Sequence, residues 1–374
     1  MIRLCKPYVG NEELKAISEV LSSGYLSQGQ KVEEFEKAVA GYVGSRYAFA
    51  TSSCTTALHL ALVASGIGPG DEVLVPDFTF PATANVVVQQ QAVPVLVDID
   101  LETFTIDIDD LQSKITAKSR AIIPVHAFGL AADMDPILAL SRKHGLVVIE
   151  DAACALGATY KGAQCGTLGD LGCFSFHPRK SITTAEGGMI TTNDDALAEK
   201  ISLLRSHGGV RREGRFVFEE AGFNYRLSEL QGAMGIEQIK KIDRILALRR
   251  KWALGLSEQL GGIERLNIPH QPDYAHHTYQ SYVVLLDDGL NRDGVISRMY
   301  TRGIETTIGT YALHSQPYFV RAFDYRPGQV TNSEQAYCRS LTLPLYTDLD
   351  DEKIEYIVDT LKNILDDQHI EHRQ

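Results

Sequence analysis

The chain has 374 residues, of which 44% are hydrophobic, and its 48 Asp and Glu outnumber its 36 Lys and Arg to give a net charge of −12 at pH 7. A chain of this length and apolar content buries a sizeable core, and typical domain sizes predict roughly two or three structural units. The acidic balance argues against nucleic acid and anionic membrane surfaces as general partners, because both attract basic proteins.

The N-terminal stretch predicts a cytoplasmic protein. Arg3, Lys6 and Glu12 interrupt it, so it lacks the apolar core of a signal peptide. Elsewhere no apolar run reaches the length needed to cross a bilayer. The six cysteines are scattered and form no Cys-x-x-Cys pair. We therefore expect reduced, mostly buried thiols and no metal site.

Seven short apolar runs predict the strands of one sheet, at residues 47–50, 72–76, 94–98, 121–125, 146–150, 172–176 and 188–192. Several are apolar on both faces, as in a sheet covered by helices on each side. Helical patterns such as TTALHLALVASG separate the earlier runs, so the alternation predicts an α/β domain with a mostly parallel sheet. The last three runs are joined by turns too short for crossover helices, and we expect at least one antiparallel strand there.

A second, smaller unit is predicted after this region. A long helical pattern from about residue 227 to residue 260 reads as the connection into it, and strand-like YQSYVVLL is followed later by the amphipathic closing helix DEKIEYIVDTLKNIL. We divide the chain into a large α/β domain with an N-terminal helical segment, residues 1–245, and a small α+β domain, residues 246–374.

Candidate ligand-binding residues directly follow these strands, at the sheet edge where α/β folds bind ligands. Ser52 and Ser53 begin a hydroxyl-rich helix start that suits a phosphate, although simple N-capping explains it equally well. Asp151 ends a buried strand, so it either caps a helix or meets a cation. Phe80 lies after another strand, where an aromatic ring is more often part of the core.

Lys180 stands between two predicted strands, in FSFHPRKSITTAEGGM. A lysine in a loop is usually a solvated charge. Here it shares a sheet edge with a phosphate-type helix start, a strand-end aspartate and an aromatic ring, which together are the parts that pyridoxal phosphate requires. The lysine forms a Schiff base, the aspartate keeps the pyridine nitrogen protonated and the helix start binds the phosphate.

At this point the sequence resembles the DegT/DnrJ/StrS aminotransferases, most of which act on nucleotide-linked keto sugars. The likeness runs nearly end to end, through GYLSQGQKVEEFEKAVAGYVG, TTALHLAL, VPDFTFPATAN, IEDAACALGA, FSFHPRK with EGGMITTND, FNYRLSELQGAMG and LPLYTDL. It implies a fold-type I enzyme with a seven-stranded sheet and a homodimer with shared active sites. It also implies a reaction in two halves, with an amino acid donor, glutamate, and a keto sugar acceptor.

The resemblance also implies roles for individual residues. Lys180 would bind the cofactor covalently and move the proton, Asp151 would pair with the ring nitrogen and Phe80 would stack on the ring. The further cofactor contacts that it implies are Cys54, Thr55, Cys154, Ser175 and, from the neighbouring subunit, Asn224. The substrate contacts that it implies are Tyr25, Arg226, Tyr311 and His314.

Two positions depart from the family pattern. Cys154 stands where the family usually has Gln or His, and its thiol is a shorter and weaker hydrogen-bond donor. Arg179, beside the lysine, replaces a small polar residue. Two other functions share the fold: a sugar dehydratase, which carries His in place of Lys180, and a cofactor-binding regulator without catalysis. The presence of both Lys180 and Asp151, and the lack of a basic or helix-turn-helix segment, favour the aminotransferase.

Overall fold

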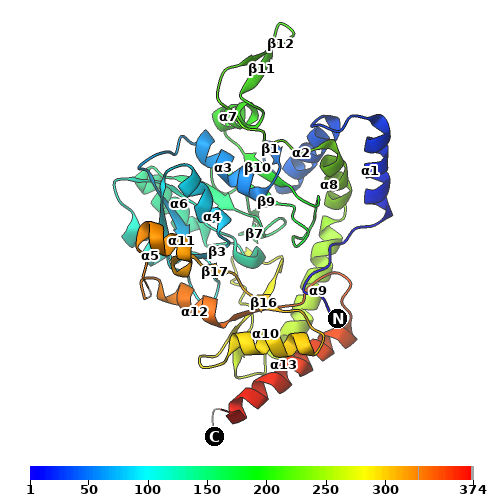
Figure 1. The fold of residues 1–374 in the computed structure, drawn as a ribbon, viewed down its shortest axis with the longest axis vertical. Coiled ribbons are helices and arrows are strands. Elements are labelled where there is room, and N and C mark those ends of the chain that lie inside the picture. The colour runs from blue at the N-terminus through cyan, green and yellow to red at the C-terminus, as the bar shows by residue number, and fades with distance from the viewer. Residues whose placement is uncertain (327, 372–374) are drawn as a thin grey trace.

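A seven-stranded sheet forms the centre of the computed structural model, which describes residues 1–326 and 328–371 (Figure 1). In spatial order its strands are β1 (Tyr47–Thr51), β10 (Gly188–Thr192), β9 (Leu171–Ser175), β6 (Val147–Asp151), β5 (Ser119–Ile122), β2 (Glu72–Pro76) and β4 (Val93–Val97). Strand β10 runs antiparallel to both neighbours, and the pairs from β9 to β4 are parallel. The predicted mostly parallel sheet is confirmed, and β10 is the antiparallel strand.

Helices cover both faces of the sheet, because successive residues of its strands are apolar and point to opposite faces. In β2, Val73 and Val75 face one buried cluster and Leu74 faces the other. The first cluster lies under α3 (Cys54–Ala64), α4 (Ala82–Gln89) and α7 (Asp195–Arg205). The second lies under α2 (Gln30–Val43), α6 (Met134–His144), the end of α8 (Glu229–Ile239) and the start of α9 (Ile242–Leu260). The short α5 (Ile108–Lys114) precedes β5, and α1 (Asn11–Ser23) packs on α8.

The candidate ligand-binding segments predicted from the sequence lie together at the carboxyl ends of the parallel strands. Strands β1, β2, β6 and β9 run in the same direction, so their carboxyl ends lie together. Beyond these ends come the start of α3, the short strand β3 (Phe78–Thr79), Asp151 and Ser175. Strand β10 enters the sheet at the same edge, with Gly188.

A second sheet and three helices build the C-terminal part. The sheet has the order β13 (Leu266–Asn267), β15 (Tyr282–Leu286), β18 (Ser340–Leu343) and β16 (Thr307–Ile308). It shares an apolar cluster with α10 (Arg292–Thr301), α13 (Asp351–Glu371) and the second half of α9. The first half of α9 belongs to a cluster of the large sheet, so this helix joins the two cores. The division at residue 245 stays a prediction.

The N-terminal residues lie against this C-terminal part, whereas the sequence grouped them with the large domain. Ile2 N–H donates to Gly303 O at 2.7 Å, and Leu345 N–H donates to Leu4 O at 3.2 Å. Other short elements tie the two parts together: β17 (Tyr311–Ala312) pairs with β3, and β14 (Ala275–His276) joins β7 (Thr159–Tyr160) and β8 (Ala163–Gln164). Helices α11 (Pro317–Phe323) and α12 (Thr331–Arg339) complete the fold.

A hairpin of β11 (Gly209–Arg212) and β12 (Arg215–Phe218) projects away from the body of the molecule at the top of Figure 1. Phe216, Val217 and Phe218 on its second strand are exposed. The sequence did not predict this hairpin. An apolar strand held out in solvent is typical of a surface that a partner covers. Among the residues that the structure describes, no helix combines the length and apolar character needed to cross a bilayer.

Candidate active site

The start of α3 offers backbone donors at the sheet edge. The hydroxyl of Ser53 caps the helix and accepts the N–H of Thr56 at 3.1 Å. The N–H groups of Cys54 and Thr55 precede any acceptor within the helix, and within residues 1–326 and 328–371 neither has a hydrogen-bond acceptor. Two free N–H groups at the positive end of a helix dipole suit an anion.

Strand β10 passes directly against this helix start. A Cβ atom on Gly188 would lie 2.4 Å from Ser53 O and 2.6 Å from Cys54 N, so only glycine leaves the corner open. Gly188 is the register partner of Ser175, and the Cys54 thiol donates to Cys173 O at 3.6 Å. The fold therefore brings Cys54, Thr55 and Ser175 to one corner, and their donors fit the phosphate of the predicted cofactor.

Asp151 lies at the end of β6 with 6% of its surface exposed. Its carboxylate accepts the Thr83 hydroxyl at 2.9 Å and the Ala153 N–H at 3.2 Å, but among the described residues no lysine or arginine forms an ion pair with it. Burial raises the pKa of Asp151 by more than these two hydrogen bonds lower it. A buried carboxylate that makes no ion pair with the described residues fits the protonated ring nitrogen of pyridoxal phosphate.

Lys180 reaches the same edge of the sheet. Its Nζ donates to Cys154 Sγ at 3.1 Å, and Cys154 follows Asp151 by three residues. Burial lowers the pKa of Lys180, but Cys154, with Cys54 and Asp151 nearby, outweighs burial and raises the pKa above its ordinary value. In the cofactor-free chain the amine is thus held by a hydrogen bond to the sulfur of Cys154.

Phe80 and Tyr311 form an exposed rim beside these groups. Phe80 is 64% exposed, so it is not the core residue that an aromatic at this position usually is. Its ring meets that of Tyr311 edge to face, with centroids 6.3 Å apart, because β17 pairs with β3. The predicted stacking of Phe80 and substrate contact of Tyr311 stay predictions, and the geometry places the two rings together.

The sequence reasoning missed Thr83, His126 and Glu150, which surround Asp151. Thr83 holds Asp151, and its own oxygen lies 3.0 Å from that of Thr79. Behind Asp151, His126 N–H donates to Asp151 O at 3.1 Å, and its ring bonds to the buried Glu150 at 2.8 Å. Neither the threonine in PATAN nor the histidine in PVHAFG indicates a role from the sequence alone. Each is recognised only when the folded sheet shows that it contacts Asp151.

Asn224, Arg226 and Tyr25 are not joined to this constellation within one chain. Asn224 is exposed, next to Tyr225, whose carbonyl accepts the N–H of Ser52 at 2.9 Å. Arg226 donates to the Ser206 hydroxyl at 3.2 Å. Tyr25 is 80% exposed in the turn between α1 and α2. Their predicted contacts with cofactor and substrate stay predictions.

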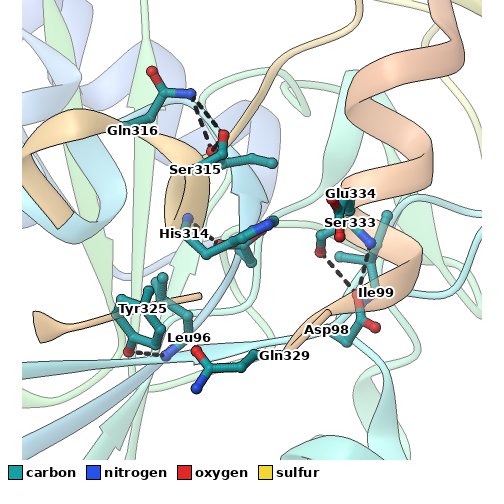
Figure 2. Close-up of polar contacts among 12 residues, drawn as sticks. Leu96, Asp98, Ile99, His314, Ser315, Gln316, Tyr325, Gln329, Ser333 and Glu334 are labelled. Carbon is teal, nitrogen blue, oxygen red and sulfur yellow. Dashed lines mark hydrogen bonds and ion pairs between the residues drawn. The ribbon is translucent and has the colours of Figure 1, made fainter. Parts of the chain in front are cut away.

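His314 is buried, with 2% of its surface exposed. Its Nδ1 lies 2.7 Å from Asp77 Oδ2, and its backbone N–H donates to Asp77 Oδ1 at 2.7 Å. Figure 2 shows His314 followed by Ser315 and Gln316, with the hydrogen-bonded pair of Asp98 and Ser333 on another side. The structure gives His314 a structural partner, and its contact with substrate stays a prediction.

The sequence matches the profile of the DegT/DnrJ/EryC1/StrS aminotransferase family over residues 7–362. The chain belongs to this family. It is 41% identical to GDP-perosamine synthase of Caulobacter vibrioides, over 97% of this chain and 98% of that protein. It is 37% identical to the spore coat polysaccharide biosynthesis protein SpsC of Bacillus subtilis, over 96% of each chain.

Solved structures of sugar aminotransferases share the fold. A putative sugar aminotransferase of Streptococcus pneumoniae, solved in its PMP form, superposes with a TM-score of 0.94 at 26% identity, over 99% of this chain and 98% of that one. PseC of Helicobacter pylori, an aminotransferase of pseudoaminic acid biosynthesis, superposes with a TM-score of 0.93 at 27% identity, over 97% and 99% of the chains. The predictions of the family, the α/β fold and a PLP-dependent aminotransferase are confirmed.

Replacing Cys154 with glutamine is expected to keep transamination within about tenfold of the parental rate, because a neutral hydrogen bond contributes about 0.5–1.5 kcal/mol. Glutamine is one of the two side chains that the resemblance implies at this position, and its amide is expected to reach Lys180. Steady-state kinetics with cofactor in excess measure this. If Cys154→Ser abolished turnover while cofactor stayed bound, the thiol would be a nucleophile in the reaction itself and this expectation would be wrong.

Proposed function

We propose that this aminotransferase moves the amino group of L-glutamate to a keto sugar carried on a nucleotide, giving an amino sugar nucleotide. The meeting of Lys180, Asp151 and the free N–H groups of α3 at one sheet edge carries the transamination part of this proposal. The nucleotide-linked sugar is supported by the relative at 41% identity, because its name, GDP-perosamine synthase, specifies such a product.

Each residue of the site has a distinct task in this proposal. Bound pyridoxal phosphate supplies an aldehyde that takes up an amino group and a ring that stabilises negative charge at the reacting carbon. The Lys180 amine would hold the cofactor, and it would carry the proton to and from that carbon. Asp151, oriented by Thr83, holds the proton on the ring nitrogen. The Cys54 and Thr55 N–H groups bind the phosphate.

The exposed rings of Phe80 and Tyr311 suit the acceptor. Aromatic rings on an open rim offer flat apolar faces to a base or a sugar while leaving polar groups in water. The two rings contact each other, and the carbonyl of Phe80 accepts the hydroxyl of Thr83, the residue that also contacts Asp151.

The active unit in this proposal is a homodimer with shared sites. The projecting hairpin exposes Phe216, Val217 and Phe218, and α1 exposes Leu14 and Leu21, so the chain carries apolar surface that it does not bury itself. Asn224 and Tyr25 are exposed and free to reach a second copy. In a twofold dimer the same surface of both subunits forms the interface. Each subunit would therefore contribute residues to the active site of the other.

A shared site predicts complementation between two defective variants. Without the charge-assisted bond from Asn224 to the phosphate, cofactor affinity is expected to fall by about 1.5–3 kcal/mol. At limiting cofactor, Asn224→Ala and Lys180→Ala proteins would each be nearly inactive. Mixed under conditions of subunit exchange, they should recover about one quarter of parental activity, because half of the dimers would be mixed and each would hold one intact site. Mixed dimers that form and stay inactive would contradict the shared site.

The substrate class is tested by a panel of nucleotide-linked 3-keto and 4-keto sugars with glutamate as donor, with release of 2-oxoglutarate as the readout. The proposal expects turnover of at least one nucleotide-linked sugar and little turnover of the same sugar without its nucleotide, since discrimination depends on hydrogen bonds across the whole ligand. Equal turnover of the free sugar would contradict the nucleotide requirement.

A further inference from the structure

Cys154 and Lys180 form a thiol–amine pair that the reaction does not require. Lys180 Nζ lies 3.1 Å from Cys154 Sγ, and each residue retains part of its surface exposed to solvent. The resemblance implies Gln or His at position 154, neither of which can be oxidised to a sulfur acid. This chain therefore has an oxidisable thiol beside the lysine that is expected to bind the cofactor.

The other five cysteines differ from Cys154. Cys54, Cys165 and Cys173 are buried, and burial raises the pKa of Cys54 and Cys173. Burial also raises the pKa of Cys5, and Cys338 is exposed on α12. Within the described part of the chain, Cys154 is the one cysteine with a lysine amine at hydrogen-bond distance. Cysteines that react lie partly exposed beside cationic groups, whereas buried ones are inert.

We propose that hydrogen peroxide joins Cys154 to Lys180 through a reversible sulfur–nitrogen bond in the cofactor-free enzyme, and that this bond blocks cofactor attachment. In the first step the sulfur attacks one peroxide oxygen. The S–O bond forms, the O–O bond breaks, and the thiol proton leaves with the other oxygen as water, so that sulfur loses two electrons and peroxide gains them.

In the second step Lys180 Nζ attacks the sulfur of the sulfenic acid. The S–N bond forms, the S–O bond breaks, and the departing hydroxyl takes a proton from the amine to leave as a second water. One thiol, one amine and one peroxide thus give one S–N bond and two waters. Two molecules of an added thiol reverse this, returning Cys154 and Lys180 and leaving a disulfide.

The surroundings of Lys180 prepare it for the second step. In the resting pair Cys154 helps raise the pKa of the amine, whereas burial lowers it. Burial is the largest single influence on the pKa of Lys180, and it favours the free amine, which is the nucleophilic form. The nitrogen is already in contact with the sulfur that it attacks.

Cofactor attachment and this bond compete for one nitrogen. The competition rests on the proposed function, since there Lys180 is the residue that binds the cofactor. Enzyme already loaded with cofactor should therefore be protected, and enzyme made or kept without it should be exposed to oxidation. The pair would act as a redox-sensitive lock on cofactor loading.

The test treats the full chain with hydrogen peroxide in cofactor-free and cofactor-loaded forms and maps its peptides without reductant. The expected product in the cofactor-free form is a cross-link between the Cys154 and Lys180 peptides that lacks two hydrogen atoms relative to their sum and disappears with dithiothreitol. Cofactor loading should lower its yield several-fold. Cys154→Ser should form none, and Cys338→Ser, the matched control, should form as much as the parent.

Uptake of pyridoxal phosphate, followed by absorbance, gives the second readout. Peroxide should lower uptake by the parent several-fold and dithiothreitol should restore it, whereas Cys154→Ser should take up cofactor equally before and after peroxide. Cys154 found as a sulfinic acid or a disulfide, with Lys180 unmodified, would overturn the proposal. If the cross-link forms but cofactor attaches to another lysine, the lock on loading is wrong and so is the assigned role of Lys180, while the S–N bond itself stands.

Discussion

Lys180→Ala is expected to lose both half-reactions of transamination. Among the residues that the structure describes, Lys180 is the one lysine at hydrogen-bond distance from Cys154, so its amine is the group placed to attach the cofactor and carry a proton. Loss of a positioned proton carrier costs about 10²–10⁴-fold in rate, and loss of covalent attachment adds to this. The variant should still hold pyridoxal phosphate, because Asp151, Phe80 and the start of α3 remain.

Each half-reaction is measured separately under single-turnover conditions, with glutamate alone and then with the keto sugar. Lys161→Ala is the matched control, because Lys161 is an exposed lysine directly after β7 that is paired with Asp135. It should keep parental rates. Transamination by Lys180→Ala at close to the parental rate would show that another residue moves the proton.

Asp151→Asn is expected to have opposite effects on cofactor binding and on the stability of the cofactor-free chain. Removing one partner of a buried charged pair costs about 2–5 kcal/mol, so cofactor affinity should fall roughly 30-fold to 4,000-fold. Without cofactor the same carboxylate is buried with only Thr83 and Ala153 as donors. Its removal should therefore stabilise the empty protein.

The pH dependence of this second effect follows from the pKa of Asp151. Burial raises it above 3.8, so folding favours the protonated carboxyl. The contribution of the side chain to stability is present at low pH and is lost as pH rises through the folded pKa. The advantage of Asn over Asp in the free energy of unfolding should thus be larger at neutral pH than at acid pH. Denaturant unfolding of cofactor-free protein measures it, and a larger advantage at acid pH would contradict the assignment.

The sequence predicted the central sheet well because its strands are buried on both faces. A run such as EVLVP leaves little alternative to a covered strand, and the polar residue after each run marks the edge where ligands bind. Asp151 and Lys180 could thus be placed at one edge before any coordinates. The contact between Lys180 and Cys154 could not be predicted, because it depends on side-chain directions in two turns.

Contacts between distant segments were not predictable. The bond between Asp77 and His314 joins residues 237 positions apart, and nothing in YALH indicates which carboxylate it meets. The hairpin of β11 and β12 gave no signal because it has no buried face to impose an alternating pattern. Thr83 was missed for a related reason, since a threonine in a helix acquires its role only from Asp151 across the sheet.

The most direct test of the whole account is to fix the cofactor in place. The purified enzyme, loaded with pyridoxal phosphate, is reduced with borohydride and digested, and the peptide that carries the cofactor is sequenced. The account predicts loss of the visible absorbance band and a single labelled peptide, with the cofactor on Lys180. Labelling of another lysine, or an unlabelled Lys180 in enzyme that is active before reduction, would contradict it.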